Sequence, residues 1–127
     1  MTEKIKFNIL KHAGDPKPYN AGTPIFKKGD PGDSMFVITH GEVDIVSEGK
    51  VVDHLTDGEI FGEMSLIDKA DRSADAVAST DCEIVIIDEP RFLYMTENTP
   101  TFALRVMQMV TARLRERMAD LERLQED

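Results

Sequence analysis

The sequence predicts a mainly β fold, an antiparallel barrel or jelly roll, followed by a long C-terminal helix. Short apolar runs bounded by turn-forming residues recur through the first two thirds of the chain, as they do in antiparallel barrels. From Pro90 onward the apolar residues follow helical spacing instead. The chain has 127 residues, 41% hydrophobic and 31% charged, which suits one domain with a substantial core. We expect one domain over residues 1–127, with the barrel at about 13–89 and the C-terminal helices at about 90–125.

Composition argues against several classes of function. The formal net charge is −9, whereas binding to nucleic acid draws on clustered cations that neutralise phosphates. Cys82 is the only cysteine, so an internal disulfide and a cysteine zinc cluster are excluded. The N-terminus lacks the pattern of a signal peptide, and no apolar run is long enough to span a membrane. We therefore expect a cytoplasmic protein that binds neither nucleic acid nor membrane.

The start of the chain is the least decided part of the prediction. Apolar residues within residues 3–12 fit either a short helix or a strand packed on the barrel. Gly14, Pro16 and Pro18 are then expected to interrupt regular structure. Residues 28–33, KGDPGD, are dense in turn formers and predict a surface loop.

Strands are expected on either side of that loop and of the turns that follow it. The run at 42–46 alternates apolar and acidic residues, so one face should meet the core and the other should meet water. His40 and Gly41 form the preceding hairpin turn, and residues 48–50 form the next one. The expected strands, with Ile25 and Phe26 facing the core in the first, are 25–26, 35–39, 42–46, 51–55, 75–79 and 83–88.

Residues 58–78, GEIFGEMSLIDKADRSADAVA, read as a cradle for an anion. A short helix over 63–68 is entered through Gly62, which can adopt backbone angles closed to other residues. The first amides of a helix have no partner within it and attract anions. Arg72 follows nine positions after Glu63, and the small Ser73 and Ala74 after it would let a ligand sit close. One anion could therefore meet both the amides and the guanidinium.

The motif FGEMSL, a spacer of five residues and RSA resemble the phosphate-binding cassette of cyclic-nucleotide-binding domains. AGTPIFKKGDPGDSMFVITHGEVDIV likewise resembles the first hairpins of that family, and DGEIFGEMSLIDKADRSADAVASTDCEIVIID its cassette and closing strands. The resemblance implies a Greek-key barrel interrupted by the cassette. It also implies that Glu63 binds the ribose 2′-hydroxyl and Arg72 the cyclic phosphate. Main-chain groups of Gly62, Met64, Ser65 and Ser73 would complete the shell.

The chemistry of the two side chains agrees with those roles. A carboxylate accepts hydrogen bonds from a hydroxyl, and a guanidinium offers a planar fork of donors for phosphate oxygens. Glu63 and Arg72 could instead simply pair with each other. Two residues depart from the family pattern: Asp71 stands where proline is common, and Asp75 where a threonine or another small residue is frequent. An acidic side chain turned toward the phosphate would oppose binding.

The ligand implied by the resemblance is cyclic AMP or cyclic GMP, and no cofactor or metal is expected. The purine should rest on apolar walls formed by Ile45, Leu55 and Phe61, with the long helix as a possible cover. The three histidines are scattered and no Gly-x-Ser-x-Gly elbow occurs, so we expect no enzyme.

The C-terminal part predicts two helices separated by the break Asn98-Thr99-Pro100. The second should run to about Glu122. Met107, Leu114 and Leu121 are seven residues apart, and with Val110 and Leu124 at alternate positions they resemble a coiled-coil seam that Arg117 interrupts. We expect a homodimer along residues 102–124; the alternative is a helix packed only on its own barrel. The basic residues Arg113, Arg115 and Arg117 are expected to form a solvated face with local ion pairs.

These features predict a stand-alone, bacterial-type cyclic-nucleotide sensor without a DNA-binding or catalytic output domain of its own. It would signal to a downstream protein partner or by a change in its own association. The alternative is a dimerisation or scaffold module that kept the fold and lost nucleotide binding.

Overall fold

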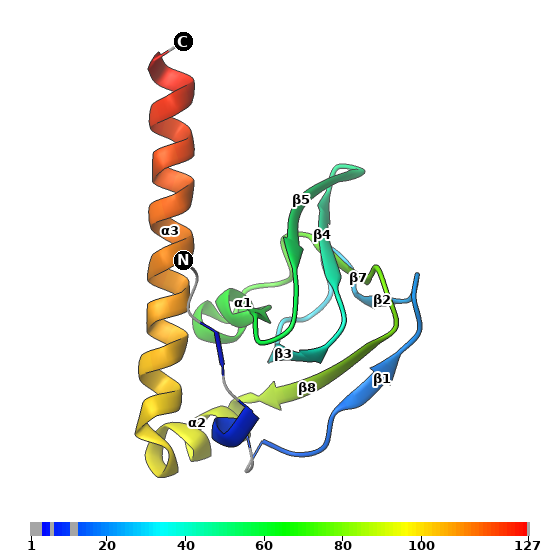
Figure 1. The fold of residues 1–127 in the computed structure, drawn as a ribbon, viewed down its shortest axis with the longest axis vertical. Helices are drawn as coiled ribbons and strands as arrows, with labels where there is room; N and C mark the ends of the chain where they lie inside the picture. The colour runs from blue at the N-terminus through cyan, green and yellow to red at the C-terminus, as the bar shows by residue number, and fades with distance from the viewer. Residues whose placement is uncertain (1–3, 6, 11–12, 127) are drawn as a thin grey trace.

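The fold was analysed in a computed structural model that describes residues 4–5, 7–10 and 13–126. Two antiparallel sheets of four strands each pack face to face, and helices lie against the outer side of one of them (Figure 1). The long C-terminal helix stands beside this barrel and continues past it. The predicted mainly β fold with flanking helices is confirmed.

The first sheet has the strand order β1-β8-β3-β6. Its central strands are apolar on both faces because one face meets the other sheet and the opposite face meets the helices. Pro18 lies inside β1 and pairs with Glu83, although a break was predicted there. A proline is tolerated because β1 is an edge strand, where one row of amides needs no partner. The strands are β1 (Lys17–Tyr19), β3 (Ser34–His40), β6 (Ile60–Phe61) and β8 (Cys82–Asp88).

The second sheet has the order β2-β7-β4-β5. β4 and β5 form a hairpin whose turn residues Glu48 and Gly49 both have positive φ, 52° and 75°. That geometry matches the right-handed twist of the two strands. The hairpin rises from the barrel on the side of the long helix (Figure 1). The strands are β2 (Pro24–Phe26), β4 (Val43–Ser47), β5 (Lys50–Leu55) and β7 (Asp75–Ala78).

Two apolar cores result from this arrangement. The barrel core lies between the sheets and contains Phe36, Phe61 and Ile84 from the first sheet with Val43 and Leu55 from the second. The helix-side core lies on the outer face of the first sheet and joins its side chains to those of the helices and of Ile5, Leu10 and Ala13. Residues 58–78 contribute to both cores, with Phe61 and Ala76 in the barrel core and Leu66 in the helix-side core.

The described residues form four helical segments beside the barrel: η1 (Phe7–Leu10, a 3-10 helix), α1 (Glu63–Asp68), α2 (Glu89–Asn98) and α3 (Pro100–Glu126). Within residues 3–12, for which a helix and a strand were both open, residues 7–10 form a short helix and residues 4–5 form neither helix nor strand. Residues 3, 6, 11 and 12 lie outside the described part. Asp88 caps α2 by accepting a hydrogen bond from the Arg91 amide at 2.9 Å. None of the described helices is long and apolar enough to cross a membrane.

The two long faces of α3 have different environments. Phe102, Val106 and Met109 are buried in the helix-side core, and Val110 packs against it. Val110, Arg117 and Leu124 form one row of the predicted dimer seam. Val110 is half-buried against the helix-side core, whereas Arg117 is exposed and Leu124 is 71% exposed. The barrel therefore borders only the first residue of this row, and the seam stays a prediction.

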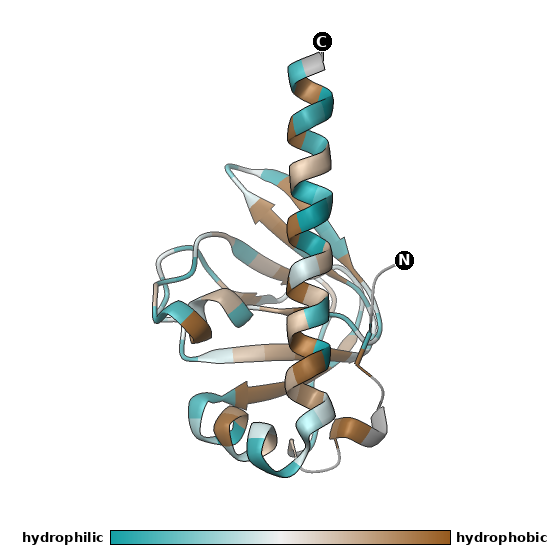
Figure 2. Ribbon diagram, turned by 90° about the vertical axis from the view of Figure 1, so that its left-hand side faces the viewer, coloured by the Kyte–Doolittle hydropathy of each residue, from teal (hydrophilic) through white to brown (hydrophobic). Residues whose placement is uncertain are grey.

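A different row accompanies Met107, Leu114 and Leu121 on the exposed face. We call the set Leu104, Met107, Thr111, Leu114, Met118 and Leu121 the exposed stripe; every member is exposed. Its spacing alternates between three and four residues, as in a coiled-coil seam. Apolar residues recur along the part of α3 that projects past the barrel (Figure 2).

Candidate functional site

The cassette begins where β6 ends. Gly62 has φ 75° and precedes the first residue of α1, and no side chain caps that helix. A Cβ at Gly62 would lie 2.8 Å from Arg72 Nη1 and 3.0 Å from Phe36 Cδ1. Only glycine fits, because the position requires both positive φ and close approach of the backbone to Arg72.

Arg72 is held inside the cassette with only 4% of its surface exposed. Its Nη1 donates to the carbonyl of Gly62 at 2.8 Å and its Nη2 to the carbonyl of Ser34 at 2.7 Å. The guanidinium carbon lies 4.3 Å from the ring centroid of Phe26 and 5.4 Å from that of Phe36, within the range of cation–π attraction. The side chain is thus fixed by two carbonyls and two rings.

The third guanidinium nitrogen, Nε, has no hydrogen-bond partner. Nε of Arg72 is buried without a hydrogen bond, the one such side-chain atom in the described part of the chain. No described carboxylate lies within ion-pair distance of the guanidinium. Burial lowers the pKa of Arg72, while the negative charges of Asp33, Glu63 and Asp30 act in the opposite direction. A buried cation without an ion-pair partner is a candidate binding site for an anion.

Glu63 is also buried, and its partner comes from α3. Arg113 Nη1 donates to Glu63 Oε1 at 3.0 Å, with side chains only 19% and 8% exposed. Arg113 also donates to the carbonyl of Ile60. The predicted alternative, in which Glu63 and Arg72 pair, is not what the structure shows. The expectation that Arg113 belongs to a solvated face is wrong, because α3 lies close enough to α1 for the guanidinium to reach the cassette.

The other predicted cassette residues differ in exposure. Ser65 is buried and donates weakly to the carbonyl of Asp71 at 3.5 Å. Met64 is 68% exposed, Ser73 is exposed, and Ala74 is half-buried. The structure therefore brings Gly62, Glu63, Ser65 and Arg72 together, while the side chains of Met64 and Ser73 point to solvent. This outcome is compatible with their predicted roles, which concern main-chain groups.

The three predicted purine walls belong to one cluster. Ile45, Leu55 and Phe61 all take part in the barrel core. Phe61 stacks on Phe36 with ring centroids 4.9 Å apart and an interplanar angle of 13°. Phe26, 6.0 Å from Phe61, completes the aromatic group under Arg72. The sequence indicated Phe26 and Phe36 only as core residues, since nothing local to them marks their contact with an arginine far along the chain.

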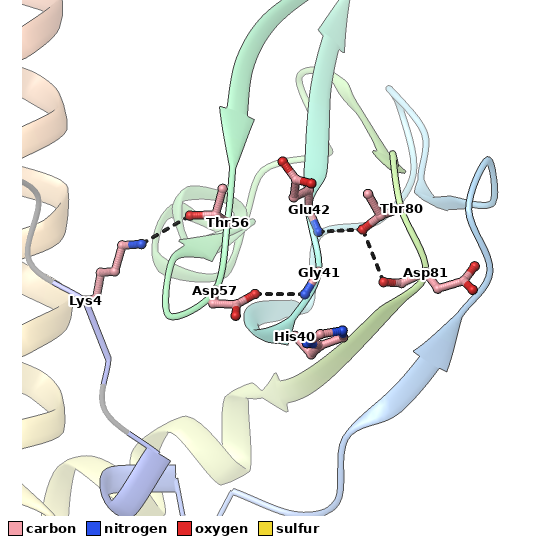
Figure 3. Close-up of a pocket in the computed structure, with 8 residues that line it drawn as sticks. All are labelled: Lys4, His40, Gly41, Glu42, Thr56, Asp57, Thr80 and Asp81. Atoms are coloured by element: carbon pink, nitrogen blue, oxygen red, sulfur yellow. Dashed lines mark hydrogen bonds between the residues drawn. The ribbon is translucent and has the colours of Figure 1, made fainter.

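An open cavity of about 700 Å³ lies elsewhere on the barrel, beside the turns that contain Gly41, Asp57 and Thr80 (Figure 3). None of its residues was predicted to bind the ligand. Its polar groups hold turns together: Asp57 accepts from the Gly41 amide at 2.8 Å, and Thr80 from the Glu42 amide at 3.0 Å. The described residues contain no group of three or more potential metal ligands. The cavity is lined by Lys4, His40, Gly41, Glu42, Thr56, Asp57, Thr80 and Asp81.

Comparison with known proteins agrees with this geometry. The family model of the cyclic nucleotide-binding domain matches residues 16–99, which include the whole cassette. The chain belongs to the cyclic nucleotide-binding domain family. The resemblance inferred from FGEMSL and RSA is thereby confirmed.

Two curated members of the cyclic nucleotide-binding family were compared with this chain by sequence identity and by the share of each chain that is matched. It is 36% identical over 109 residues to the cyclic AMP receptor protein of Thermus thermophilus, covering 82% of this chain and 50% of that protein. It is 39% identical over 75 residues to the cAMP-dependent protein kinase regulatory subunit of Schizosaccharomyces pombe, covering 58% of this chain and 18% of that subunit. The chain thus spans half or less of these curated relatives.

The fold of a cyclic nucleotide-binding protein is also recovered among solved structures. The crystal structure of the Thermus thermophilus catabolite activator protein superposes with a TM-score of 0.81 at 31% identity. The superposition covers 94% of this chain and 58% of that one. A cyclic nucleotide-binding domain from Methylobacillus flagellatus gives a TM-score of 0.70 at 30% identity, with 78% of this chain and 61% of that one covered.

Proposed function

We propose that this domain is a regulatory sensor that binds cyclic AMP or cyclic GMP and performs no catalysis itself. The observation that carries the proposal is Arg72, a buried guanidinium with an unpartnered Nε and no neighbouring carboxylate in ion-pair contact. Matched relatives are a cyclic AMP receptor and kinase regulatory subunits. Another matched relative is a cGMP-dependent protein kinase, of which the match spans 10% of the length.

In this proposal the cyclic phosphate lies against Arg72, whose free donor then acquires an anionic acceptor. A hydrogen bond to a charged group contributes roughly 1.5–3 kcal/mol. Main-chain groups of Gly62, Met64, Ser65 and Ser73 complete the phosphate shell, and Ala74 leaves room beside it. The purine rests on the apolar side chains of Ile45, Leu55 and Phe61. No cofactor is required for this binding.

Glu63 receives the ribose 2′-hydroxyl and links the ligand to α3. An ionised carboxylate has acceptor sites for several donors, so a hydroxyl can join or displace Arg113. Either change alters the contact between the cassette and α3, because Arg113 is held by both Glu63 and the Ile60 carbonyl. The long helix is therefore the element that would report binding to a downstream partner.

We also propose that α3 forms a homodimer through the exposed stripe. Met107, Leu114 and Leu121 are each 59% exposed, an unusual state for large apolar side chains at regular spacing. Burying one of them fully against a second copy would contribute roughly 1.5–3 kcal/mol. The dimer lies within the predicted residues 102–124, with the seam moved to the face that the barrel leaves uncovered.

Calorimetric titration with cyclic AMP and cyclic GMP, side by side, tests the nucleotide proposal. We expect at least one of them to bind, and Arg72→Ala nearly to abolish binding because the charged contact to phosphate is lost. Arg113→Ala provides a comparison that leaves the phosphate contact in place. Heat from neither nucleotide would favour the alternative of a scaffold module. Binding of Arg72→Ala within a few-fold of the parent would remove Arg72 from the site.

A further inference from the structure

The loop of residues 27–33, between β2 and β3, is joined to the main chain of Arg72. The Gly29 amide donates to the carbonyl of Arg72 at 2.8 Å, and the Arg72 amide donates to the carbonyl of Asp30 at 2.9 Å. These two bonds resemble one step of an antiparallel ladder. The backbone of Arg72 is thus placed by a loop more than 40 residues earlier in the sequence.

The same loop reaches the cassette at two further points. A Cβ at Gly32 would lie 2.2 Å from Ser65 Cβ and 2.6 Å from the Ala70 carbonyl oxygen, so the loop packs against the cassette without a gap. Ser34, directly after the loop, accepts the hydrogen bond from Arg72 Nη2. Both the backbone and the guanidinium of Arg72 therefore depend on where residues 27–34 lie.

Asp75 holds the beginning of this loop. Its Oδ1 accepts a hydrogen bond from the Lys28 amide at 2.8 Å. Lys28 is followed directly by Gly29, which donates to Arg72, and Asp75 itself stands three residues after Arg72. Asp75 is therefore linked to Arg72 in two ways: along the chain, and through the hydrogen bonds of Lys28 to Asp75 and of Gly29 to Arg72. A hydrogen bond to an ionised acceptor is stronger than one between neutral groups.

We propose that Asp75 is a positioning residue for the phosphate arginine, acting through the loop of residues 27–33. This inference rests on the proposed nucleotide binding. It assigns a favourable role to a side chain whose negative charge, considered alone, would repel a phosphate. The two effects have opposite signs and depend on different properties: positioning needs an acceptor oxygen, whereas repulsion needs the charge.

Replacing Asp75 with asparagine and with alanine separates these properties. Asp75→Asn retains an acceptor oxygen and loses the charge, whereas Asp75→Ala loses both. In calorimetric titration with cyclic AMP and cyclic GMP, we expect Asp75→Ala to bind about tenfold more weakly, as for the loss of one charge-assisted hydrogen bond. We expect Asp75→Asn to bind as tightly as the parent or more tightly.

The matched control is Asp71→Ala. Asp71 is an exposed carboxylate next to Arg72, and its removal changes the charge by the same amount. It should leave affinity unchanged or raise it slightly. Hydrogen exchange of the unliganded variants gives a second readout: Asp75→Ala should accelerate exchange at residues 28–30 and 72, and Asp75→Asn should not.

Three outcomes would overturn the inference. Tighter binding by both Asp75 variants would mean that the carboxylate acts only by repulsion. Parent-like affinity of Asp75→Ala, with the parent binding normally, would show that the loop positions Arg72 without Asp75. Failure of the unmutated protein to bind either nucleotide would overturn the proposed function, and the inference with it. That last result is distinguishable because it appears before any substitution is made.

Discussion

Arg113 on α3 donates a hydrogen bond to Glu63 on α1 at 3.0 Å, which connects the longest helix directly to the cassette. The two residues are 50 positions apart in sequence, and both are largely shielded from water. If this contact transmits ligand binding, removing Arg113 should uncouple the helix from the site while leaving Arg72 intact.

A double-mutant cycle with Arg113→Ala and Glu63→Gln measures this contact. Each single change should lower the free energy of unfolding by about 1–3 kcal/mol, because a partly buried charged group loses its partner. The coupling between the two sites should be about 0.5–3 kcal/mol, the range found for residues in contact. Urea unfolding curves provide the measurement. Strictly additive effects would show that the pair contributes no interaction energy.

Nucleotide binding should change hydrogen exchange in two separate regions. We expect altered protection at residues 60–74, where the ligand is proposed to lie, and also within residues 90–124. A ligand can shift the helices only by as much as its affinity differs between their two arrangements, and a tenfold difference corresponds to about 1.4 kcal/mol. Arg113→Ala should retain the first change and weaken the second. Protection limited to the cassette in the parent would contradict the role proposed for α3.

The dimer seam can be tested with two leucines near the end of α3. Leu121 belongs to the exposed stripe, whereas Leu124 lies on the row of Val110 and Arg117. Leu121→Asp and Leu114→Asp should each give a folded monomer, since a charge replaces a buried apolar contact, while Leu124→Asp should remain a dimer. Light scattering at tens of micromolar reports the mass. A monomeric parent protein would refute the dimer, and a monomeric Leu124→Asp would return the seam to the other row.

The stability of the β4–β5 hairpin should depend on pH through His54. Its Nδ1 lies 2.6 Å from Asp44 Oδ1 and its Nε2 lies 2.7 Å from Glu42 Oε1, so both ring nitrogens must carry a proton for both bonds to form. The carboxylate of Asp53 also lies close by, where it accepts from the His54 amide and from Arg117. The hydrogen bonds to Asp44 and then Glu42 raise the pKa of His54 above 6.5, opposed by desolvation.

A raised pKa in the folded state fixes the sign of this dependence. The contribution of His54 to stability is fully present below about pH 6.5 and is lost as pH rises through the higher folded pKa. Urea unfolding of the parent and of His54→Gln should therefore differ more at pH 6 than at pH 8.5. His40→Gln, at the exposed end of β3, serves as the control. An equal difference at both pH values would mean that the imidazolium is not the stabilising form.

The sequence by itself determined the mainly β fold, most of its strands, the short helix at the start of the cassette and the C-terminal helices. These features depend on local patterns: period-two alternation at Val43–Ser47, the glycine before Glu63, and a run of helix formers after Pro100. Local rules also predicted that a helix begins near Pro90. They missed β1 through Pro18, because whether a proline is tolerated in a strand depends on which neighbour that strand has.

Only the tertiary structure decided which side chains meet across the chain. The heptad rows through Val110 and through Leu104 are both consistent with the sequence. Only the position of the barrel shows that Val110 in the first row is half-buried, whereas every member of the second row is exposed. The partner of Glu63 is Arg113 rather than Arg72 because α3 passes close enough to α1 for the Arg113 side chain to reach Glu63, a contact with no local signature. Asp75 likewise accepts a hydrogen bond from the Lys28 amide because β2 and β7 are paired in the same sheet. Spacing can indicate what a residue is able to bind, but its actual neighbours depend on packing between distant segments.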